Sequence, residues 1–326
     1  MQKDLVSIIT PSYNTGHLIH RLLDSVLMQD YPYVEMYIVD DGSTDNISEV
    51  ISNYRNKFSD KGYSLYFSTQ PNSGQAAAVN SVLQKVNGEF LTWPDSDDFY
   101  ISNEAISTFV KSFRQIDEDY GLVRSQPTFL DEETMTPLKP YTTLTNDNNQ
   151  FENCLFNKNF IWPPISYMIR QELLRCVNPD MQIYSAHHGA QNWQMLLPLL
   201  YTYKCYTIQQ HVAGVLERRT SYSRGTFKTY EQQINYLNGF EELIDYTLDT
   251  IIKMPEDKRL RYKMLIHNKY LLEKFNISMG FLQIDKAKLY REEIDKRSIP
   301  LSFKEKFKYY LIHYPLVYRI IRKIVA

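Results

Sequence analysis

The sequence predicts an α/β fold, in which a mostly parallel sheet with flanking helices is followed by a helical C-terminal region. Up to about residue 125, short runs rich in β-branched and aromatic residues alternate with amphipathic runs of helix length. This alternation is typical of a parallel sheet with crossover helices. Beyond Gly225 the apolar spacing becomes almost purely helical. A chain of 326 residues can build one such domain together with a smaller appendage.

Five strands and three crossover helices are expected in the first part of the chain. The strand candidates are residues 5–10, 34–40, 63–68, 90–93 and 121–124. Apolar residues recur at helical spacing between them, over residues 18–26, 47–54 and 78–86. The next segment, residues 126–159, is rich in Thr, Asn, Asp and Pro, which predicts a long loop. The remainder holds a second apolar block, residues 161–212, and two long helices that Pro255 separates, residues 230–252 and 258–279.

The bulk composition is that of a globular protein. Hydrophobic residues make up 43% and charged residues 23%, and the formal net charge is -2, which excludes a protein that coats nucleic acid. The cysteines, Cys154, Cys176 and Cys205, form no CxxC pair, which argues against a disulfide framework and a zinc site. The first strand candidate follows Met1 without the apolar region of a signal peptide, and no stretch reaches the length of a membrane span. We therefore expect a cytoplasmic protein that binds no nucleic acid.

Polar residues gather where the predicted strands end. The four runs are TPSYN from residue 10, DDGS from residue 40, QPNSGQ from residue 70 and PDSDD from residue 94. Ligands of open α/β sheets bind beyond the carboxyl ends of the strands, so these runs are expected to converge on one edge. Each has a structural explanation when taken singly, because Asp-Gly-Ser is a common turn and Asp or Asn often caps a helix. Their recurrence at four strand ends favours a binding site.

The acidic run Asp95-Ser96-Asp97-Asp98 indicates a metal site. Carboxylates this close repel one another unless a cation or hydrogen bonds neutralise them. Mg²⁺ or Mn²⁺ uses one or two protein carboxylates and shares its other positions among water and substrate phosphates, which points to a diphosphate ligand. The chain has neither GxGxxG after its first strand nor GxxxxGK[ST], so dinucleotide and P-loop binding are disfavoured.

Four motifs together resemble those of family 2 glycosyltransferases. They read VSIITPSYN from Val6, IVDDGSTD from Ile38, NSGQ from Asn72 and DSDD from Asp95, in the order and spacing of that family, and the resemblance covers about residues 5–220. It implies a GT-A fold and a kinship with bacterial glycosyltransferases of capsule and surface polysaccharide synthesis. The catalytic domain would cover residues 1–225, with a nucleotide and metal half over about 1–125 and an acceptor half over about 126–225, and residues 226–326 would form the helical region.

The resemblance also implies roles for residues of the four motifs. The ring of Tyr13 and the carboxylate of Asp41 would hold the base, most often uracil, and Asp95 would face the ribose or the donor sugar. Asp97 would coordinate the Mn²⁺ or Mg²⁺ bound to the diphosphate. Four further residues would complete the pocket, Pro11 and Asn14 at the base and Asn72 and Gln75 near the sugar.

The chain departs from the family pattern at Asn192. Family members commonly carry Glu-Asp or Gln-Asp before an aromatic residue here, and that Asp is the usual catalytic base, whereas this chain reads Gln191-Asn192-Trp193. An amide cannot take a proton near neutral pH, and loss of a general base typically costs about 10²- to 10⁴-fold in rate. His187 and His188 are the candidate bases because their pKa suits the task, although both can equally be solvent-exposed loop residues. Asn192 would then orient the acceptor.

Other side chains are candidates for substrate contact. Arg218, Arg219 and Arg224 can close over the diphosphate, because Arg suits bidentate phosphate contacts, or can form a solvated charge run. Trp162 lies in a loop setting where an acceptor could pass, whereas Trp93 and Trp193 are expected in the core or the wall of the site.

The leading interpretation is an inverting, metal-dependent glycosyltransferase of hexosyltransferase type. It would move a sugar from a nucleotide diphosphate donor, most often a UDP-sugar, to a saccharide acceptor that can be lipid-linked. Inversion and the lipid-linked acceptor follow from the resemblance alone. One alternative is an impaired transferase that acts as a nucleotide- or glycan-binding module, which Asn192 favours and the intact Asp95 and Asp97 disfavour. A sugar-phosphate nucleotidylyltransferase would need a Gly-rich loop after the first strand, where this chain has TPSY.

The C-terminal end is predicted to bind an anionic membrane surface. One helical stripe holds Phe303, Phe307, Tyr310, Leu311 and Tyr314, and Pro315 can begin a second, basic helix. Residues 302–326 carry six Lys or Arg against one Glu, a net charge of +5, which leaves -7 for the rest of the chain. Dense aromatic residues with positive charge are typical of a helix in an anionic lipid interface, so we expect peripheral attachment to the inner face of the cell membrane. The alternative is packing on the catalytic domain or on a partner subunit in a homo-oligomer.

Overall fold

The computed structural model describes residues 1–138, 149–158, 160, 162–185, 191–218 and 227–314. The chain divides into two compact units. The first consists of Met1–Arg219 together with Tyr246–Met254, and the second of Thr220–Asp245 together with Pro255–Ala326. Each unit is described by itself.

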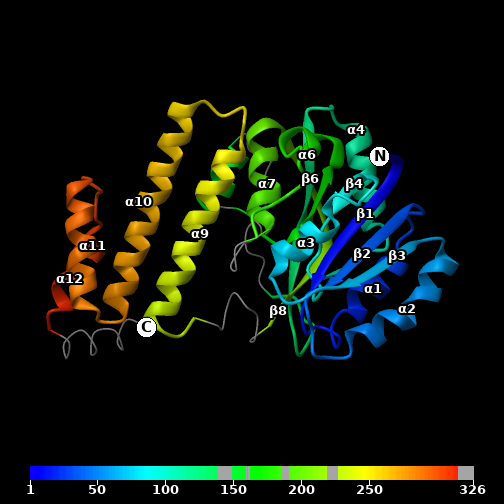
Figure 1. The fold of residues 1–326 in the computed structure, drawn as a ribbon, viewed down its shortest axis with the longest axis horizontal. Coiled ribbons are helices and arrows are strands. Elements are labelled where there is room, and N and C mark those ends of the chain that lie inside the picture. Colours follow the sequence, from blue (N-terminus) through cyan, green and yellow to red (C-terminus); the bar gives the residue numbers. More distant parts are fainter. Residues whose placement is uncertain (139–148, 159, 161, 186–190, 219–226, 315–326) are drawn as a thin grey trace. The chain divides into compact units, whose positions relative to one another are not determined.

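The first unit is built on one mixed sheet whose described strands lie in the order β3-β2-β1-β4-β7-β6-β8-β5. The strands are β1 (Gln2–Ser12), β2 (Val34–Asp40), β3 (Ser64–Thr69), β4 (Gly88–Thr92), β5 (Phe99–Tyr100), β6 (Tyr120–Asp131), β7 (Tyr167–Arg170) and β8 (Lys204–Glu217). β1 pairs in parallel with β2 and β4, and β2 pairs in parallel with β3 (Figure 1). The carboxyl ends of β1 to β4 therefore meet at one edge, as the sequence predicted.

Helices cover this sheet. They are α1 (His20–Leu27), α2 (Ile47–Lys61), α3 (Gln75–Leu83), α4 (Ala105–Gln115), α5 (Gln150–Leu155), α6 (Gln171–Val177) and α7 (Gln191–Thr202), with a 3₁₀ turn, η1, at Pro164–Ser166. The first three are the expected crossover helices.

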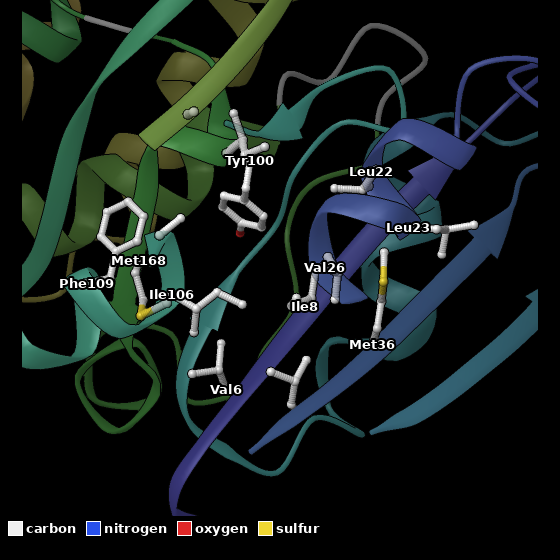
Figure 2. Close-up of a cluster of buried hydrophobic side chains, with 14 of the residues drawn as sticks. Val6, Ile8, Leu22, Leu23, Val26, Met36, Tyr100, Ile106, Phe109 and Met168 are labelled. Atoms are coloured by element: carbon white, nitrogen blue, oxygen red, sulfur yellow. The ribbon is translucent and has the colours of Figure 1, made fainter. Parts of the chain in front are cut away.

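A large hydrophobic cluster packs α1, α2 and α4 against the sheet. Side chains of a strand alternate between its two faces, so Val6 and Ile8 of β1 point to the same side. Figure 2 shows these two residues with Leu22 and Val26 of α1 and with Met36 of β2. All five side chains are fully buried. This buried layer fixes the strands whose ends carry the polar loops.

The predicted loop over residues 126–159 is wrong in its first part. β6 continues to Asp131 and pairs in parallel with β8, so that Gln126 lies opposite His211 and Asp131 opposite Glu217. Pro127 lies at a shift of register in this pairing, where a missing N–H is tolerated. The residues that pair with this segment lie more than eighty positions further along the chain, so its polar composition misled the prediction. α5 also lies in the expected loop, and residues 139–148 are outside the described part of the chain.

The second unit is helical. It contains the larger part of α9 (Tyr230–Thr250), with α10 (Glu256–Gly280), α11 (Ile284–Lys296) and α12 (Phe303–Leu311). The two predicted long helices correspond to α9 and α10, and Pro255 is the N-cap of α10. Buried apolar residues of α10, α11 and α12 form a separate core, which includes Phe275, Ile294 and Leu311. Within the described ranges we find no helix with the length and hydropathy needed to cross a membrane.

Candidate functional site

The loop that follows β1 presents an aromatic ring at the edge of the sheet. The side chain of Tyr13 is 50% exposed there. Asn14 adopts a left-handed conformation with φ of 53°. Its N–H donates to Ser43 Oγ at 2.8 Å, and its Oδ1 accepts from the N–H of Thr44 at 2.8 Å. These contacts fix the loops after β1 and β2 to each other, and Pro11 lies just before them within β1.

Asp41 joins the loops after β2 and β3. Its buried carboxylate accepts from Gln70 Nε2 at 2.8 Å and from the N–H of Ser73 at 2.9 Å, both through Oδ1. Its Oδ2 accepts from the N–H of Gly74 at 2.7 Å. Hydrogen bonds to a carboxylate are charge-assisted and strong, and a carboxylate has about four acceptor positions. Asp41 therefore orders the third loop and keeps capacity for one further donor.

The third loop brings Asn72 and Gln75 to the same edge. A side chain at Gly42 would place its Cβ 2.8 Å from the backbone nitrogen of Asn72, and Gly42 has φ of 77°, so both the space and the conformation require glycine. Gln75 is the first residue of α3, and its Nε2 donates to Asp95 Oδ1 at 3.1 Å. Asn72 is exposed beside it. The third loop is thereby linked to the acidic run.

The acidic run forms a turn after β4. The N–H of Asp98 donates to the carbonyl of Asp95 at 3.2 Å. Between them Ser96 is buried, and its Oγ accepts from Thr15 Oγ1 at 2.9 Å. Thr15 is in turn 2.6 Å from Ser12 Oγ. This chain of buried hydroxyls ties the acidic turn to the end of β1, so all four predicted loops are joined.

The charges of the acidic turn are only partly balanced. Burial, with the charge of Asp97 as the second cause, raises the pKa of Asp95 to about 7. Burial and the charges of Asp97 and Asp95 raise the pKa of Asp98 well above its ordinary value. Arg218 lowers both pKa values to a smaller extent, and its Nε lies 3.0 Å from Asp97 Oδ2. Protonation or a further cation would relieve the remaining repulsion.

These residues fit a divalent cation that is bound together with a phosphate ligand. Asp97 is 21% exposed in its side chain, so it can reach a ligand at the surface of the site. Among the residues that the structure describes, no three His, Cys, Asp or Glu side chains converge as a complete ligand set. Mg²⁺ and Mn²⁺ do not require one, because oxygen ligands from water and substrate phosphates complete their coordination.

The first turn of α7 forms the other side of the site. Gln191 Nε2 lies 3.4 Å from Asp95 Oδ1. Asn192 accepts through Oδ1 from Trp93 Nε1 at 2.8 Å and donates through Nδ2 to the carbonyl of Trp162 at 2.9 Å. Each end of the Asn192 amide thus holds one neighbour. Among the described residues, one N–H and one lone pair of the amide are left for further hydrogen bonds.

The three tryptophans of the chain gather around Asn192. Trp93 and Trp193 are buried, which confirms the prediction that they belong to the core or the wall. The rings of Trp162 and Trp193 meet edge to face, with centroids 4.9 Å apart. Trp162 is less buried and stays a candidate for acceptor contact. The candidate bases His187 and His188 lie outside the described residues.

Three positioning contacts were missed from sequence. They are the hydrogen bond of Thr15 with Ser96, the approach of Gln191 to Asp95 and the ion pair of Arg218 with Asp97. Thr15 directly follows the first motif and Ser96 lies within the last one, so their hydroxyl groups were a usable signal. Arg218 was noted for its charge, but nothing in the sequence indicates which carboxylate it meets.

Comparison with known proteins gives one matching family. The sequence model described as "Glycosyl transferase family 2" matches residues 7–177. The chain is 42% identical over 96 residues to the putative teichuronic acid biosynthesis glycosyltransferase TuaG of Bacillus subtilis, an alignment that covers 29% of this chain and 37% of TuaG. It is 38% identical over 104 residues to the UDP-Glc:alpha-D-GlcNAc-diphosphoundecaprenol beta-1,3-glucosyltransferase WfgD of Escherichia coli, covering 32% of this chain and 39% of WfgD. The chain therefore spans about two fifths of the length of these relatives.

Solved structures with a similar fold cover nearly the whole chain. Residues 1–349 of S. aureus TarS in complex with UDP-GlcNAc superpose with a TM-score of 0.61 at 19% identity, over 98% of this chain and 92% of that one. The mannosyltransferase PcManGT from Pyrobaculum calidifontis, in complex with GDP-Man and Mn²⁺, gives 0.56 at 17% identity, over 98% and 87%. At these identities the similarity establishes the fold, and the expected GT-A architecture is confirmed.

Proposed function

Because this chain belongs to glycosyl transferase family 2, we propose that it is a glycosyltransferase that moves a sugar from a UDP-sugar donor to a saccharide acceptor. The observation that carries the proposal is the joined edge of the sheet, where Asp41, Asp95 and Asp97 lie in loops that hydrogen-bond one another. Together with the exposed ring of Tyr13, this edge offers a stacking surface, an acceptor for a base N–H and carboxylates for a metal–diphosphate group. A UDP-sugar carries a partner for each.

In this proposal residues 1–125 form the donor half of the site. Tyr13 stacks on the base and Asp41 accepts from it, while Pro11 and Asn14 shape the base pocket and Asn72 lines it near the sugar. Gln75 and Asp95 face the ribose or the sugar. The hydrogen bond between these two side chains supports a shared ligand contact, since the same atoms can turn to sugar hydroxyls.

Asp97 is the proposed ligand of Mn²⁺ or Mg²⁺. Its partial exposure and the repulsion within the acidic turn support this assignment. When bound, such an ion stabilises the negative charge that develops on the departing diphosphate. The chain's part is to hold the diphosphate in line with the acceptor hydroxyl, which would attack C1 of the sugar with inversion.

The acceptor half is proposed to lie in residues 126–225. Asn192 cannot act as a base, so the proton of the acceptor hydroxyl is assigned to His187 or His188, with Asn192 orienting the acceptor. A lipid-linked saccharide is the proposed acceptor, because the name of WfgD specifies a diphosphoundecaprenol-linked one. A rate that falls as pH drops through the imidazole pKa, and its loss in His187→Ala or His188→Ala, would support this base. Full activity in both variants would contradict it.

Calorimetry with UDP tests the donor site. UDP should bind more tightly with Mn²⁺ than with a chelator, and Asp97→Ala should remove this difference, whereas Asp60→Ala, the same change on the exposed face of α2, should keep it. Equal affinity with metal and chelator would contradict the metal site. Turnover of a panel of UDP-sugars completes the test, since UDP binding without any turnover would favour the binding-module alternative.

A matched pair of tyrosines tests the stacking surface. Tyr13 and Tyr33 are 50% and 53% exposed, but Tyr33 lies at the amino end of β2, away from the strand-end loops. Tyr13→Ala should weaken UDP binding by about 5- to 100-fold, because stacking of a base on an aromatic ring contributes about 1–3 kcal/mol. Tyr33→Ala should leave the affinity unchanged. Equal effects of the two variants would remove the stacking role.

We further propose that α12 attaches the protein peripherally to an anionic membrane surface, on the cytoplasmic side. Four of the five stripe residues are exposed: Phe303 by 84%, Phe307 by 46%, Tyr310 by 61% and Tyr314 by 51%. Leu311 instead packs into the core of the second unit. An exposed aromatic face within a segment of net charge +5, residues 302–326, has the composition of an interfacial helix.

Sedimentation with liposomes tests the membrane proposal. Phe303→Ser with Phe307→Ser should reduce recovery with anionic liposomes and leave the fold intact, because both rings point away from the core. The matched control is Leu260→Ser with Leu289→Ser, two exposed apolar residues on α10 and α11. Truncation near residue 297 is less suitable, since it removes Leu311 from the core. Equal recovery of wild type and the double Phe variant would leave packing or a homo-oligomer as the role of the stripe.

A further inference from the structure

Arg218 brings a fixed positive charge to the carboxylate that is proposed to bind the metal. It follows directly after β8, and its Nε lies 3.0 Å from Asp97 Oδ2. The side chains are only 16% and 21% exposed, so water and salt screen this pair less than an ion pair at the surface. The contact is therefore a feature of the site and not an incidental surface pair.

The main chain of β8 determines this placement. Gly214 pairs with Phe99 of β5, and a Cβ at Gly214 would lie only 2.7 Å from Ile101 Cγ2 and 3.1 Å from the ring of Phe99, so the side chains of both residues lie directly against this part of β8. Two residues later the N–H of Leu216 lies 3.4 Å from Asp98 Oδ1. Strand pairing thus delivers the next residues of the chain to the acidic turn.

Arg218 and Asp97 form an ion pair that lacks the alignment of a hydrogen bond. Arg218 Nε is buried, and among the described residues it has no acceptor aligned as a hydrogen bond requires. A buried N–H without an aligned acceptor destabilises the arrangement. Phosphate oxygens suit the planar fork of a guanidinium, so an arriving diphosphate would satisfy this donor better than Asp97 does.

We propose that Arg218 is a resident counter-ion that holds Asp97 in the absence of donor and passes to the diphosphate when a divalent cation takes its place. This inference rests on the proposed donor and metal site. A divalent cation and a guanidinium repel each other when both lie against one carboxylate. Arg218 therefore opposes binding of the metal alone and favours binding of the nucleotide, so that metal and nucleotide bind as a coupled pair.

Two binding measurements on Arg218→Gln test the exchange. Free Mn²⁺, followed by electron paramagnetic resonance, reports the affinity for metal alone, and calorimetry reports the affinity for UDP at saturating Mn²⁺. We expect the variant to bind Mn²⁺ alone about 5- to 100-fold more tightly and UDP more weakly by a similar factor, the range usual for coupled sites. Arg55→Gln, on the exposed face of α2, is the matched control and should change neither.

The lysine variant separates charge from shape. Arg218→Lys keeps the positive charge but loses the planar fork, so it should leave Mn²⁺ affinity near the wild-type value and still weaken UDP binding. Unchanged or weaker Mn²⁺ binding in Arg218→Gln would overturn the inference, as would unchanged UDP binding. The proposed metal site itself fails if Mn²⁺ does not strengthen UDP binding in the wild type, or if Asp97→Ala leaves that effect unchanged. Failure of the metal site can therefore be distinguished from failure of the inference about Arg218.

Discussion

The two sides of the site hold their side chains in different ways. On the donor side, carboxylates lie in short loops and are oriented by backbone N–H groups and hydroxyls of neighbouring loops, as at Asp41. On the α7 side, the neutral amide of Asn192 is held between two tryptophans. The proposed donor side therefore keeps charged carboxylates, whereas the α7 side presents a neutral amide whose two ends each hold one neighbour.

The contacts of Asn192 give a structural reason for an amide at this position, where the family resemblance leads us to expect an aspartate. An aspartate at this position could still accept from Trp93, but its second oxygen would face the carbonyl oxygen of Trp162, where Nδ2 now donates. Two acceptors in contact repel each other, and neither would be satisfied. The surroundings of Asn192 are thus adapted to an amide.

The largest expected effect comes from removing the centre of the donor side. Asp41→Ala should weaken UDP binding by at least about 100-fold, because it removes three charge-assisted hydrogen bonds that order the third loop, together with the proposed contact to the base. Calorimetry measures this loss, and Asp60→Ala is the control. An unchanged affinity would mean that the donor side is not organised by Asp41.

The next effect tests the α7 side. Asn192→Asp should lower the melting temperature by about 2–8 °C at pH 8, since an unsatisfied acceptor costs about 1–3 kcal/mol when fully buried and Asn192 is half-buried. The loss should shrink at pH 4, because the facing carbonyl oxygen raises the pKa of the new carboxyl and the protonated form can donate to that oxygen of Trp162. Tryptophan fluorescence follows unfolding directly, because all three tryptophans surround this residue.

A neighbouring asparagine supplies the control for that prediction. Asn157 Oδ1 accepts from Trp162 Nε1 at 2.5 Å. Asn157→Asp keeps an acceptor at this position, so its melting temperature should stay near the wild-type value. A stable Asn192→Asp variant with increased turnover would show that the position still accommodates a base, and the contrast between the two sides would be lost.

A smaller effect is expected from the hydroxyl chain that joins the motifs. Thr15→Val removes the hydrogen bonds to Ser12 and Ser96 with little change in volume. Loss of about 1 kcal/mol of orientation should raise the KM for donor by about fivefold with a smaller change in kcat. Thr15→Ser keeps the hydroxyl and should restore the wild-type value. If the two variants behave alike, the acidic turn is positioned without this chain.

The smallest expected effect is a gain in stability. The pKa of Asp95 is raised from 3.8 to about 7, so the folded protein binds more protons than the unfolded chain between these values. The contribution of this group to stability is therefore full below about pH 4 and is lost as pH rises to about 7. Asp95→Asn should raise the melting temperature by about 2–4 °C at pH 8 in chelator and have little effect at pH 4. A lower melting temperature of Asp95→Asn at pH 8 would contradict the conclusion that the ionised Asp95 carboxylate destabilises the fold.

Much of the donor side could be predicted from sequence because each of its strands and the polar loop after it are formed by adjacent residues. A parallel strand followed by a polar loop identifies both the element and the edge to which it points, and β1 to β4 appear within a few residues of their predicted positions. The same logic failed for residues 126–131, where a strand exists only because β8 pairs with it.

The sequence alone determined the α/β architecture, the edge at which the four motifs meet and the identity of the carboxylates there, since apolar periodicity and strand-end chemistry are properties of neighbouring residues. Tertiary structure alone decided the partners of those groups. Arg218 meets Asp97 across 121 positions, and Asn192 lies between Trp93 and Trp162 because strands and a helix from separate parts of the chain pack together. Such contacts depend on the packing of the sheet and its helices, which no run of adjacent residues encodes.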